Sequence, residues 1–274
     1  MSDLFEDVAG LIREAAEREI MPRFRSLSDE DIHEKAKNDL VTTADRNAEA
    51  WLTPELEKLL PGSRVLGEEA VAEDHSLLEI VRSDIPFWTV DPVDGTGNFV
   101  DGKETFGVMV ALVEEGVTTH AWVYLPVPDE MFMAEHGGGT ILVADENESA
   151  VHVPPAPGEL SGAMGALNDH YMPEPWKARI GALAPRIGRR ASVMCSAWEY
   201  TNIMRGRQHF AVYYRMMPWD HAPTTLLLRE AGGVMRRIDT GVDYDARSES
   251  GPHLAAASEE LWGLISKEVL STSV

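Results

Sequence analysis

The sequence lacks most features of secreted or membrane-spanning proteins. It contains one cysteine, Cys195, so an intrachain disulfide is impossible. The apolar run at residues 106–113 is much shorter than the ~20 residues that a transmembrane helix needs. The first seven residues are acidic and lack the basic and apolar regions of a signal peptide. We therefore predict a cytoplasmic protein that does not contact membranes.

Basic residues are also scarce. Lysine and arginine number 24 against 46 aspartates and glutamates, which gives a net charge of −22. Such a surface repels nucleic acid and anionic lipid, so neither is an expected partner. It also repels phosphorylated molecules. A phosphate-binding site in this chain must therefore be locally positive, and bound metal ions are one way to achieve that.

The chain does have the composition of a folded globular protein. Its 274 residues, 44% of them hydrophobic, suffice for one large domain or two coupled halves. The proline-rich stretch at 151–158 is the candidate seam, which would divide the chain into halves 1–150 and 151–274. The first half would carry most of the functional acids, and the second would carry Asp220 and part of the substrate pocket.

Hydrophobic periodicity predicts a mixture of helices and strands. Helices are expected at 3–25, 45–60, 173–183, 197–205, 219–231 and 258–269. Strands are expected at 65–66, 87–90, 106–113, 117–124, 130–134, 140–143, 192–194, 210–214 and 253–257. The closely spaced strands between 106 and 143 indicate an antiparallel meander, with a hairpin turn at Gly137-Gly138-Gly139. The mixture predicts layered α and β structure, with a mixed sheet in the second half.

The most informative segment is Asp91-Pro92-Val93-Asp94-Gly95-Thr96-Gly97-Asn98-Phe99. An apolar strand carries two aspartates to its end, Pro92 fixes the backbone between them, and Gly95 permits a tight turn. Oxygen ligands on irregular backbone suit a hard cation such as Mg²⁺. If a helix begins at Gly95 and Thr96, their N–H groups can also receive a phosphate. Taken alone, Asp94-Gly95 is more often a simple turn.

Two further acidic sites have similar settings. Glu68 follows a short apolar strand, and Asp220 stands at the start of a helix. By itself Glu68 reads as a solvated surface charge, and Asp220 reads as a helix N-cap. A cluster of such carboxylates would repel one another by ~3 kcal/mol per pair at 5 Å and an effective dielectric of 20. Divalent ions would remove that penalty, so the three segments together favour a metal site.

These segments resemble the inositol monophosphatase family of lithium-sensitive, magnesium-dependent phosphatases. The resemblance rests on Gly67-Glu68-Glu69, on the Asp91–Phe99 string, and on Trp219-Asp220-His221-Ala222 in that order. Asp39-Leu40-Val41-Thr42-Thr43-Ala44-Asp45 and the closing segment His253-Leu254-Ala255-Ala256-Ala257-Ser258 extend it over nearly the whole chain. It implies a layered α-β-α-β-α sandwich, a homodimer, and hydrolysis of a small phosphate monoester with two or three Mg²⁺ ions.

The resemblance also implies a role for individual residues. Glu68, Asp91 and the Val93 carbonyl would hold the first ion. Asp91, Asp94 and Asp220 would hold the second, and Glu68 would bind a third through water. Asp45 and Thr96 would orient and help deprotonate the attacking water. The backbone amides of Gly95 and Thr96 would contact the phosphate.

Departures from the family pattern concern the substrate. Tyr213 stands where inositol-specific relatives have a glutamate that contacts sugar hydroxyls, and Pro223 follows Trp219-Asp220-His221-Ala222. Inositol 1-phosphate is the family default, while histidinol phosphate, fructose bisphosphate and 3′-phosphoadenosine nucleotides are alternatives. A catalytically silent, metal-loaded phosphoester sensor and an acidic structural protein are alternatives of other classes.

Other residues are assigned lesser roles. The two residues between Asp91 and Asp94 distinguish the string from the Asp–x–Asp motif of haloacid-dehalogenase phosphatases, so we expect no aspartyl-phosphate intermediate. Cys195 is expected to be a small buried residue and His221 a neighbour of the ligands and not itself a ligand. Lys35 and Lys37 are expected to be solvated.

Overall fold

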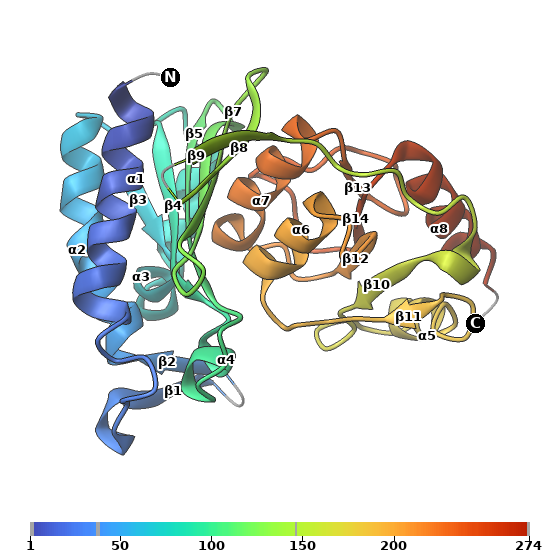
Figure 1. Ribbon diagram of the computed structural model, residues 1–274, viewed down its shortest axis with the longest axis horizontal. Helices are drawn as coiled ribbons and strands as arrows, with labels where there is room; N and C mark the ends of the chain where they lie inside the picture. The colour runs from blue at the N-terminus through green and yellow to red at the C-terminus, as the bar shows by residue number, and fades with distance from the viewer. Residues whose placement is uncertain (1–2, 37–38, 146, 273–274) are drawn as a thin grey trace.

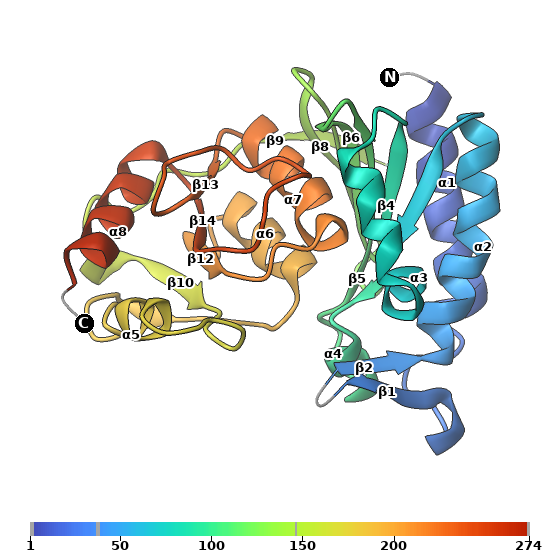
Figure 2. The same ribbon diagram turned by 180° about the vertical axis from the view of Figure 1, so that it is seen from behind.

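The computed structural model describes residues 3–36, 39–145 and 147–272. The chain forms five layers, which alternate between helices and sheets (Figure 1, Figure 2). Two long helices cover one sheet, a second pair of helices lies between the two sheets, and further helices cover the outer side of the second sheet. The expected α-β-α-β-α sandwich is thus confirmed.

The first layer consists of α1 (Asp3–Ala15) and α2 (Thr43–Leu59). α1 continues through a π-helical turn, Ala16–Ile20, after which residues 21–25 form turns. The predicted helix at 3–25 is therefore too long, because Pro22 has no N–H to continue the helical hydrogen bonds and Arg25 has a positive φ of 59°. Val8, Ile12 and Leu52 are buried on the faces of these helices that meet the sheet.

The first sheet has seven strands in the order β3-β4-β5-β6-β7-β8-β9. Its strands are β3 (Arg64–Gly67), β4 (Phe87–Asp94), β5 (Gly107–Glu114), β6 (Val117–Leu125), β7 (Glu130–Glu135), β8 (Gly139–Ala144) and β9 (Asn147–Val151). β3 and β4 are parallel and the rest are antiparallel, which confirms the meander and its glycine turn.

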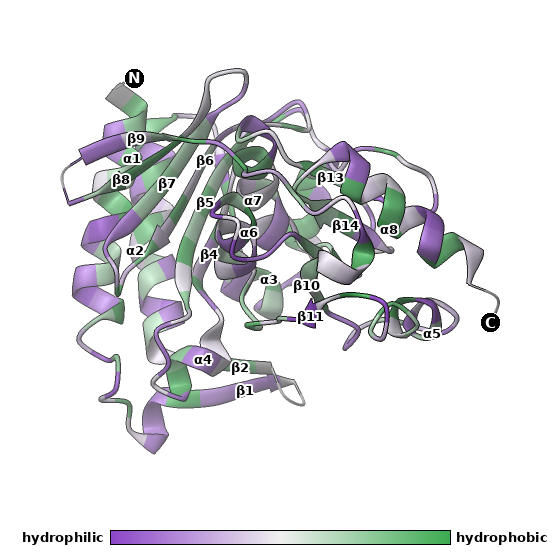
Figure 3. Cartoon of the chain, turned by 45° about the vertical axis from the view of Figure 1, so that its right-hand side comes forward, coloured by the Kyte–Doolittle hydropathy of each residue, from purple (hydrophilic) through white to green (hydrophobic). Residues whose placement is uncertain are grey.

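The central strands of this sheet are buried on both faces. Val108 and Val110 of β5 pack toward α1 and α2, while Met109 belongs to the core on the opposite face. The sequence of β5 is therefore a continuous apolar run without polar alternation. Figure 3 shows the hydrophobic colour on the central strands, whereas the edge strand β9 is mostly hydrophilic.

The middle layer holds α6 (Ser196–Met204) and α7 (Pro218–Glu230). Because α7 lies between two sheets, nearly all its side chains are buried, and an apolar stripe on one side would not suffice. α7 begins at Pro218, so Pro223 lies inside the helix, beyond its first turn. Gly107 of β5 lets α6 approach, since a Cβ there would stand 2.9 Å from the Ala197 Cβ.

The second sheet is mixed, as predicted, with the order β11-β10-β12-β14-β13. Its strands are β10 (Met164–Leu167), β11 (Arg189–Arg190), β12 (Phe210–Tyr213), β13 (Val234–Arg237) and β14 (His253–Ala256). α5 (Trp176–Gly181) and α8 (Glu259–Ser271) complete the outer layer. The strand expected at 192–194 is wrong, because Met194 has a positive φ of 54°.

Several short elements beside the site were not predicted. They are the hairpin of β1 (Ile32–Ala36) and β2 (Asp39–Thr42), and the helix α3 (Glu68–Glu73). The short helix α4 (Thr96–Val100) begins where the sequence suggested a helix start. Three 3₁₀ segments, Asp29–Asp31, His75–Arg82 and Leu160–Gly162, complete the description. Among the described residues, the helices are all too short or too polar to cross a bilayer. The division of the chain at residue 150 stays a prediction.

Candidate active site

Strand β4 places two aspartates on the same side of its end. Asp91 pairs with Met109 of β5 and Asp94 pairs with Gly107, so β4 advances three residues while β5 advances two. Residues three apart in a regular strand point to opposite faces, but the extra residue of this bulge brings both carboxylates together. Pro92 suits the bulge because it has no N–H to pair.

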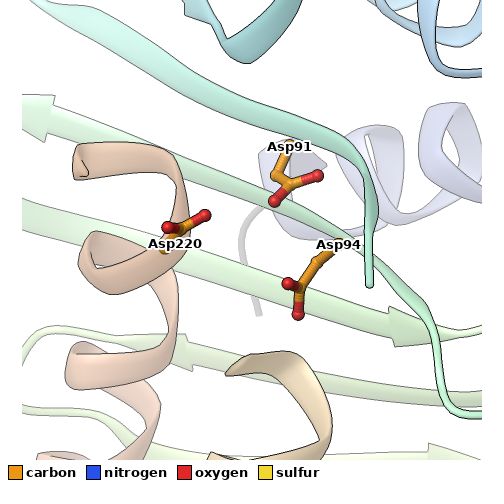
Figure 4. A group of neighbouring side chains, drawn as sticks. All are labelled: Asp91, Asp94 and Asp220. Atoms are coloured by element: carbon orange, nitrogen blue, oxygen red, sulfur yellow. The ribbon is translucent and has the colours of Figure 1, made fainter. Parts of the chain in front are cut away.

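The third carboxylate comes from the other half of the chain. Asp220 lies in the first turn of α7, whose N-cap is Met217, so the simple N-cap interpretation of Asp220 is wrong. Carboxylate oxygens of Asp91, Asp94 and Asp220 all lie within 4.8 Å of one another, and Figure 4 shows the three side chains converging. Such a group of oxygen donors could hold a metal ion.

The carboxylates of this cluster are poorly solvated and repel one another. Burial raises the pKa of Asp91 well above its usual range, and the charges of Glu68, Asp94 and Asp220 add to the effect. Burial also raises the pKa of Asp94 and of Asp220. Asp94 is held by the Ala197 N–H at 2.6 Å and by the Cys195 Sγ at 3.0 Å. Without a cation, the site therefore favours protonated carboxyls.

Asp45 and Thr96 form a hydrogen-bonded pair next to the cluster. Asp45 closes the N-terminal capping box of α2, where its Oδ2 accepts from the Thr42 N–H at 2.8 Å and from the Thr42 hydroxyl at 2.5 Å. Its Oδ1 lies 3.1 Å from the Thr96 Oγ1, which is also 3.0 Å from the Val93 carbonyl oxygen. Burial raises the pKa of Asp45 to about 6. One oxygen of Asp45 thus fixes the helix while the other faces Thr96.

Glu68 is the first residue of α3 and lies outside the cluster of three aspartates. It lines a cavity that Asp91, Asp94 and Asp220 also line. Its Oε1 accepts from the Lys35 Nζ at 2.8 Å, and Lys35 also contacts Glu69 at 2.8 Å. The side chain of Lys35 is only 12% exposed, so the expectation of a solvated lysine is wrong. Lys35 lies on the β1–β2 hairpin, which places it beside Glu68. Hydrophobic periodicity does not reveal so short a hairpin. Lys37 lies outside the described residues.

Gly95 and Thr96 connect the cluster to α4. Gly95 has a φ of 84°, in the left-handed region that glycine adopts readily. A Cβ at this position would also stand 3.0 Å from the Thr105 carbonyl oxygen. α4 begins at Thr96, which agrees with the expected helix start, and both residues line the cavity.

The wall of the cavity contributed by the second half contains a residue that the sequence analysis missed. Glu199 of α6 is 1% exposed and accepts the Tyr213 hydroxyl at 2.9 Å. Tyr213 lines the same cavity, and its hydroxyl is bonded to this carboxylate. An acid among the apolar residues of α6 is the signal that could have revealed Glu199.

Two other predicted residues take the places expected of them. Cys195 is buried, and burial raises the pKa of its thiol well above the usual range. The Nε2–H of His221 donates to the Arg215 carbonyl at 3.1 Å, its Nδ1 accepts from the Tyr200 hydroxyl at 3.2 Å, and burial lowers its pKa to about 3. It is a neutral residue packed behind Asp220.

All predicted site residues except Asp45 line one cavity of about 630 Å³. These are Glu68, Asp91, Val93, Asp94, Gly95, Thr96, Tyr213 and Asp220. Asp45 reaches this cavity through its contact with Thr96. The arrangement combines a cation-binding group, a hydroxyl–carboxylate pair and open space for a small molecule.

Comparison with known proteins identifies the class to which this fold and site belong. The chain matches the model of the inositol monophosphatase family over residues 4–270. It belongs to that family of phosphatases.

Individual relatives support the assignment. The chain is 32% identical to the inositol-1-monophosphatase of Bacillus subtilis over 233 residues, or 83% of each chain. It is 29% identical to the fructose-1,6-bisphosphatase/inositol-1-monophosphatase of Thermotoga maritima, over 72% of this chain and 71% of the other. It is also 29% identical to the Nus factor SuhB of Vibrio cholerae, over 77% and 76%. A solved inositol monophosphatase structure from Thermotoga maritima superposes with a TM-score of 0.79 at 25% identity, covering 98% and 97% of the two chains.

Proposed function

We propose that the protein hydrolyses a small phosphate monoester in a Mg²⁺-dependent reaction. The convergence of Asp91, Asp94 and Asp220 beside the Asp45–Thr96 pair is the observation that supports this most strongly. Three clustered carboxylates, one buried and two partly buried, repel one another without a cation, and their oxygen atoms suit Mg²⁺. Family membership and the names of the relatives from Bacillus subtilis and Thermotoga maritima agree with this chemistry.

In this proposal Asp91, Asp94 and Asp220 hold one ion, and Glu68, Asp91 and the Val93 carbonyl hold another. A third, weaker ion would bind near Glu68, whose Oε1 lies 2.8 Å from the Lys35 Nζ. When bound, the ions supply positive charge for the phosphate and lower the pKa of water.

The residues of the chain then divide the remaining work. Thr96 orients the attacking water with its hydroxyl, and Asp45 accepts a proton through the Thr96 hydroxyl, to which its Oδ1 is bonded. The raised pKa of Asp45, about 6, brings it nearer to the working range of a general base. The amides of Gly95 and Thr96 bind phosphate oxygens. Tyr213 lies on the side where the alcohol group of the substrate would rest.

A substrate panel with a matched variant tests the proposal. Phosphate release is measured with inositol 1-phosphate, histidinol phosphate, fructose 1,6-bisphosphate and a 3′-phosphoadenosine nucleotide, with and without Mg²⁺. We expect Mg²⁺-dependent turnover of at least one ester. Asp220→Asn should lower it by about 100-fold or more, the scale of losing a charged group aimed at the reacting centre. Asp84→Asn makes the same charge change at an exposed position and should leave it unchanged.

Two outcomes would contradict the proposal. Equal turnover rates in the Asp220→Asn and Asp84→Asn variants would show that the reaction does not require the Asp220 carboxylate. Mg²⁺ binding without turnover of any ester would instead favour the phosphoester sensor. A homodimer, a cytoplasmic location and inhibition by Li⁺ are further proposals that rest on the family resemblance.

A further inference from the structure

The cavity wall around Glu199 has little capacity left to bind sugar hydroxyls. Glu199 Oε2 accepts from the Asn168 side-chain amide at 2.7 Å and from the Tyr213 hydroxyl at 2.9 Å. Its Oε1 accepts from the Ser192 hydroxyl at 2.8 Å and from the Val193 N–H at 3.2 Å. A carboxylate has about four acceptor sites. Asn168, Tyr213 and Val193 donate to three of them, and the single proton of the Ser192 hydroxyl is shared between Glu199 Oε1 and the Asn168 Oδ1, which lies 2.8 Å away. A polyol would therefore find at most one acceptor site of Glu199 open.

The mouth of the same cavity presents two large side chains to solvent. Tyr171 is 54% exposed and Met194 is 67% exposed, and both line the cavity. Met194 has a φ of 54°, which costs a non-glycine residue ~1–2 kcal/mol. A strained backbone that holds a large apolar side chain at the mouth of a site points to use of that side chain.

The charged residues around this mouth are largely paired with one another. Arg190 contacts Asp169 at 3.4 Å, and Lys103 contacts Asp101 at 2.8 Å. The Arg215 guanidinium lies 5.2 Å from the centre of the Tyr171 ring. The His170 and Tyr171 rings pack edge to face, with their centres 4.7 Å apart. These contacts orient the Tyr171 ring while leaving about half of the residue accessible. The mouth therefore suits an uncharged, flat apolar group better than an ion.

We propose that the substrate is a phosphate monoester whose alcohol portion carries an aromatic ring, which packs against Tyr171 and Met194. The inference rests on the proposed function and specifies its substrate class. A cavity of about 630 Å³ has room for the phosphate and a ring. The phosphate lies at the carboxylate cluster, and the ring extends past Glu199 to the mouth.

Benzyl phosphate and ethyl phosphate test this subsite, since both are simple alkyl esters and only one has a ring. With Mg²⁺-loaded enzyme, we expect kcat/KM for benzyl phosphate to exceed that for ethyl phosphate by about tenfold. Tyr171→Ala and Met194→Ala should each lower the benzyl value about three- to tenfold, mainly through KM, and leave the ethyl value within about twofold. Tyr171→Phe keeps the ring and should retain the preference. Leu270→Ala removes an exposed apolar residue on α8 and should change neither.

The outcomes separate this inference from the proposed function. Turnover of both esters without a preference for the ring would overturn the aromatic subsite alone. Equal losses for both esters in the two variants would assign Tyr171 and Met194 a structural role and also overturn it. If those losses accompany dissociation of a dimer in size-exclusion chromatography, the mouth is an interface between copies. Absence of turnover with every ester would overturn the proposed function and this inference together.

Discussion

At the scale of single residues, the carboxylates proposed to bind the metal would destabilise the folded protein when no cation is bound. Asp91, Asp94 and Asp220 come together without any basic residue among the three, and burial raises the pKa of each. Groups that would repel one another in the empty site become complementary to a divalent cation. The cluster therefore makes a clear prediction about the stability of the metal-free protein.

Asp220→Asn should stabilise the metal-free protein at pH 8 while it impairs activity. The folded-state pKa of Asp220 is raised, so the folded state holds its proton more strongly than the unfolded state. Its stability contribution is complete below the unfolded pKa and is lost as the pH rises through the folded pKa. Asparagine does not ionise, so this loss disappears. In EDTA at pH 8, the variant should melt at a temperature a few degrees higher, at about 2–4 °C per kcal/mol for a chain of this size.

Thermal unfolding followed by circular dichroism checks this, with Asp84→Asn as the control. The difference in melting temperature between Asp220→Asn and wild type should be smaller at pH 4.5. In Mg²⁺ the wild type should melt at the higher temperature, because it gains the free energy of Mg²⁺ binding. A lower melting temperature of Asp220→Asn in EDTA at pH 8 would contradict the account.

Much of this site could be predicted from the sequence at the residue scale. The Asp91–Asp94 string carries its own local signal, because proline and glycine around two acids predict irregular backbone with oxygen ligands. Lys35 and Glu199 could not be assigned in this way. Lys35 reaches Glu68 through a pairing 33 residues away, and Glu199 meets Tyr213 only when two elements pack. The sequence pattern can single out such a residue, but it does not identify the partner that the residue contacts.

At the scale of elements, the start of α3 determines where Glu68 lies. Glu49 of α2 accepts the N–H groups of Glu69 and Ala70, each at 2.8 Å, and so caps α3. Gly67 immediately precedes α3, and an added Cβ would stand 2.2 Å from the Glu49 Cδ. The absence of a Cβ at Gly67 thus leaves room for the buried Glu49 carboxylate, which positions the first residue of α3.

Gly67→Ala should destabilise the protein and weaken Mg²⁺ binding. The new methyl group displaces Glu49 from the N–H groups of α3, and overpacking of this kind costs ~1–3 kcal/mol. Gly10→Ala is the matched control, because a Cβ there has nothing within 4 Å and alanine favours the α1 helix by up to ~1 kcal/mol. Urea unfolding and isothermal titration with Mg²⁺ measure both effects. Equal stability of the two variants would show that the capping contact does not matter.

Regular elements with strong periodicity were the predictable ones. The long apolar run of β5 and the helix over α2 follow from their patterns, whereas α3, α4 and the β1–β2 hairpin have too few residues to establish a period. The segment 192–194 has the composition of a strand, yet the Ser192 hydroxyl and the Val193 N–H bind Glu199. Tertiary contacts therefore override local preference next to the site.

At the scale of the whole molecule, the site depends on the packing of two sheets around α6 and α7. β4 of the first sheet supplies Asp91 and Asp94, and α7, which packs on β5 and β6, supplies Asp220. The order of layers followed from the family resemblance and the antiparallel meander from its turns, while the strand order of the second sheet was not predicted. With a net charge of −22, the protein repels phosphate esters except where cations gather. The central claim is therefore that a divalent cation binds between the end of β4 and the start of α7.

Crystals grown with Mn²⁺ in place of Mg²⁺ test that claim most directly, through an anomalous difference map recorded alongside activity under the same ion. We predict an anomalous peak coordinated by Asp91, Asp94 and Asp220 together, and its loss in crystals of Asp220→Asn. A Mn²⁺-active enzyme whose map shows no peak at these three aspartates would contradict the account.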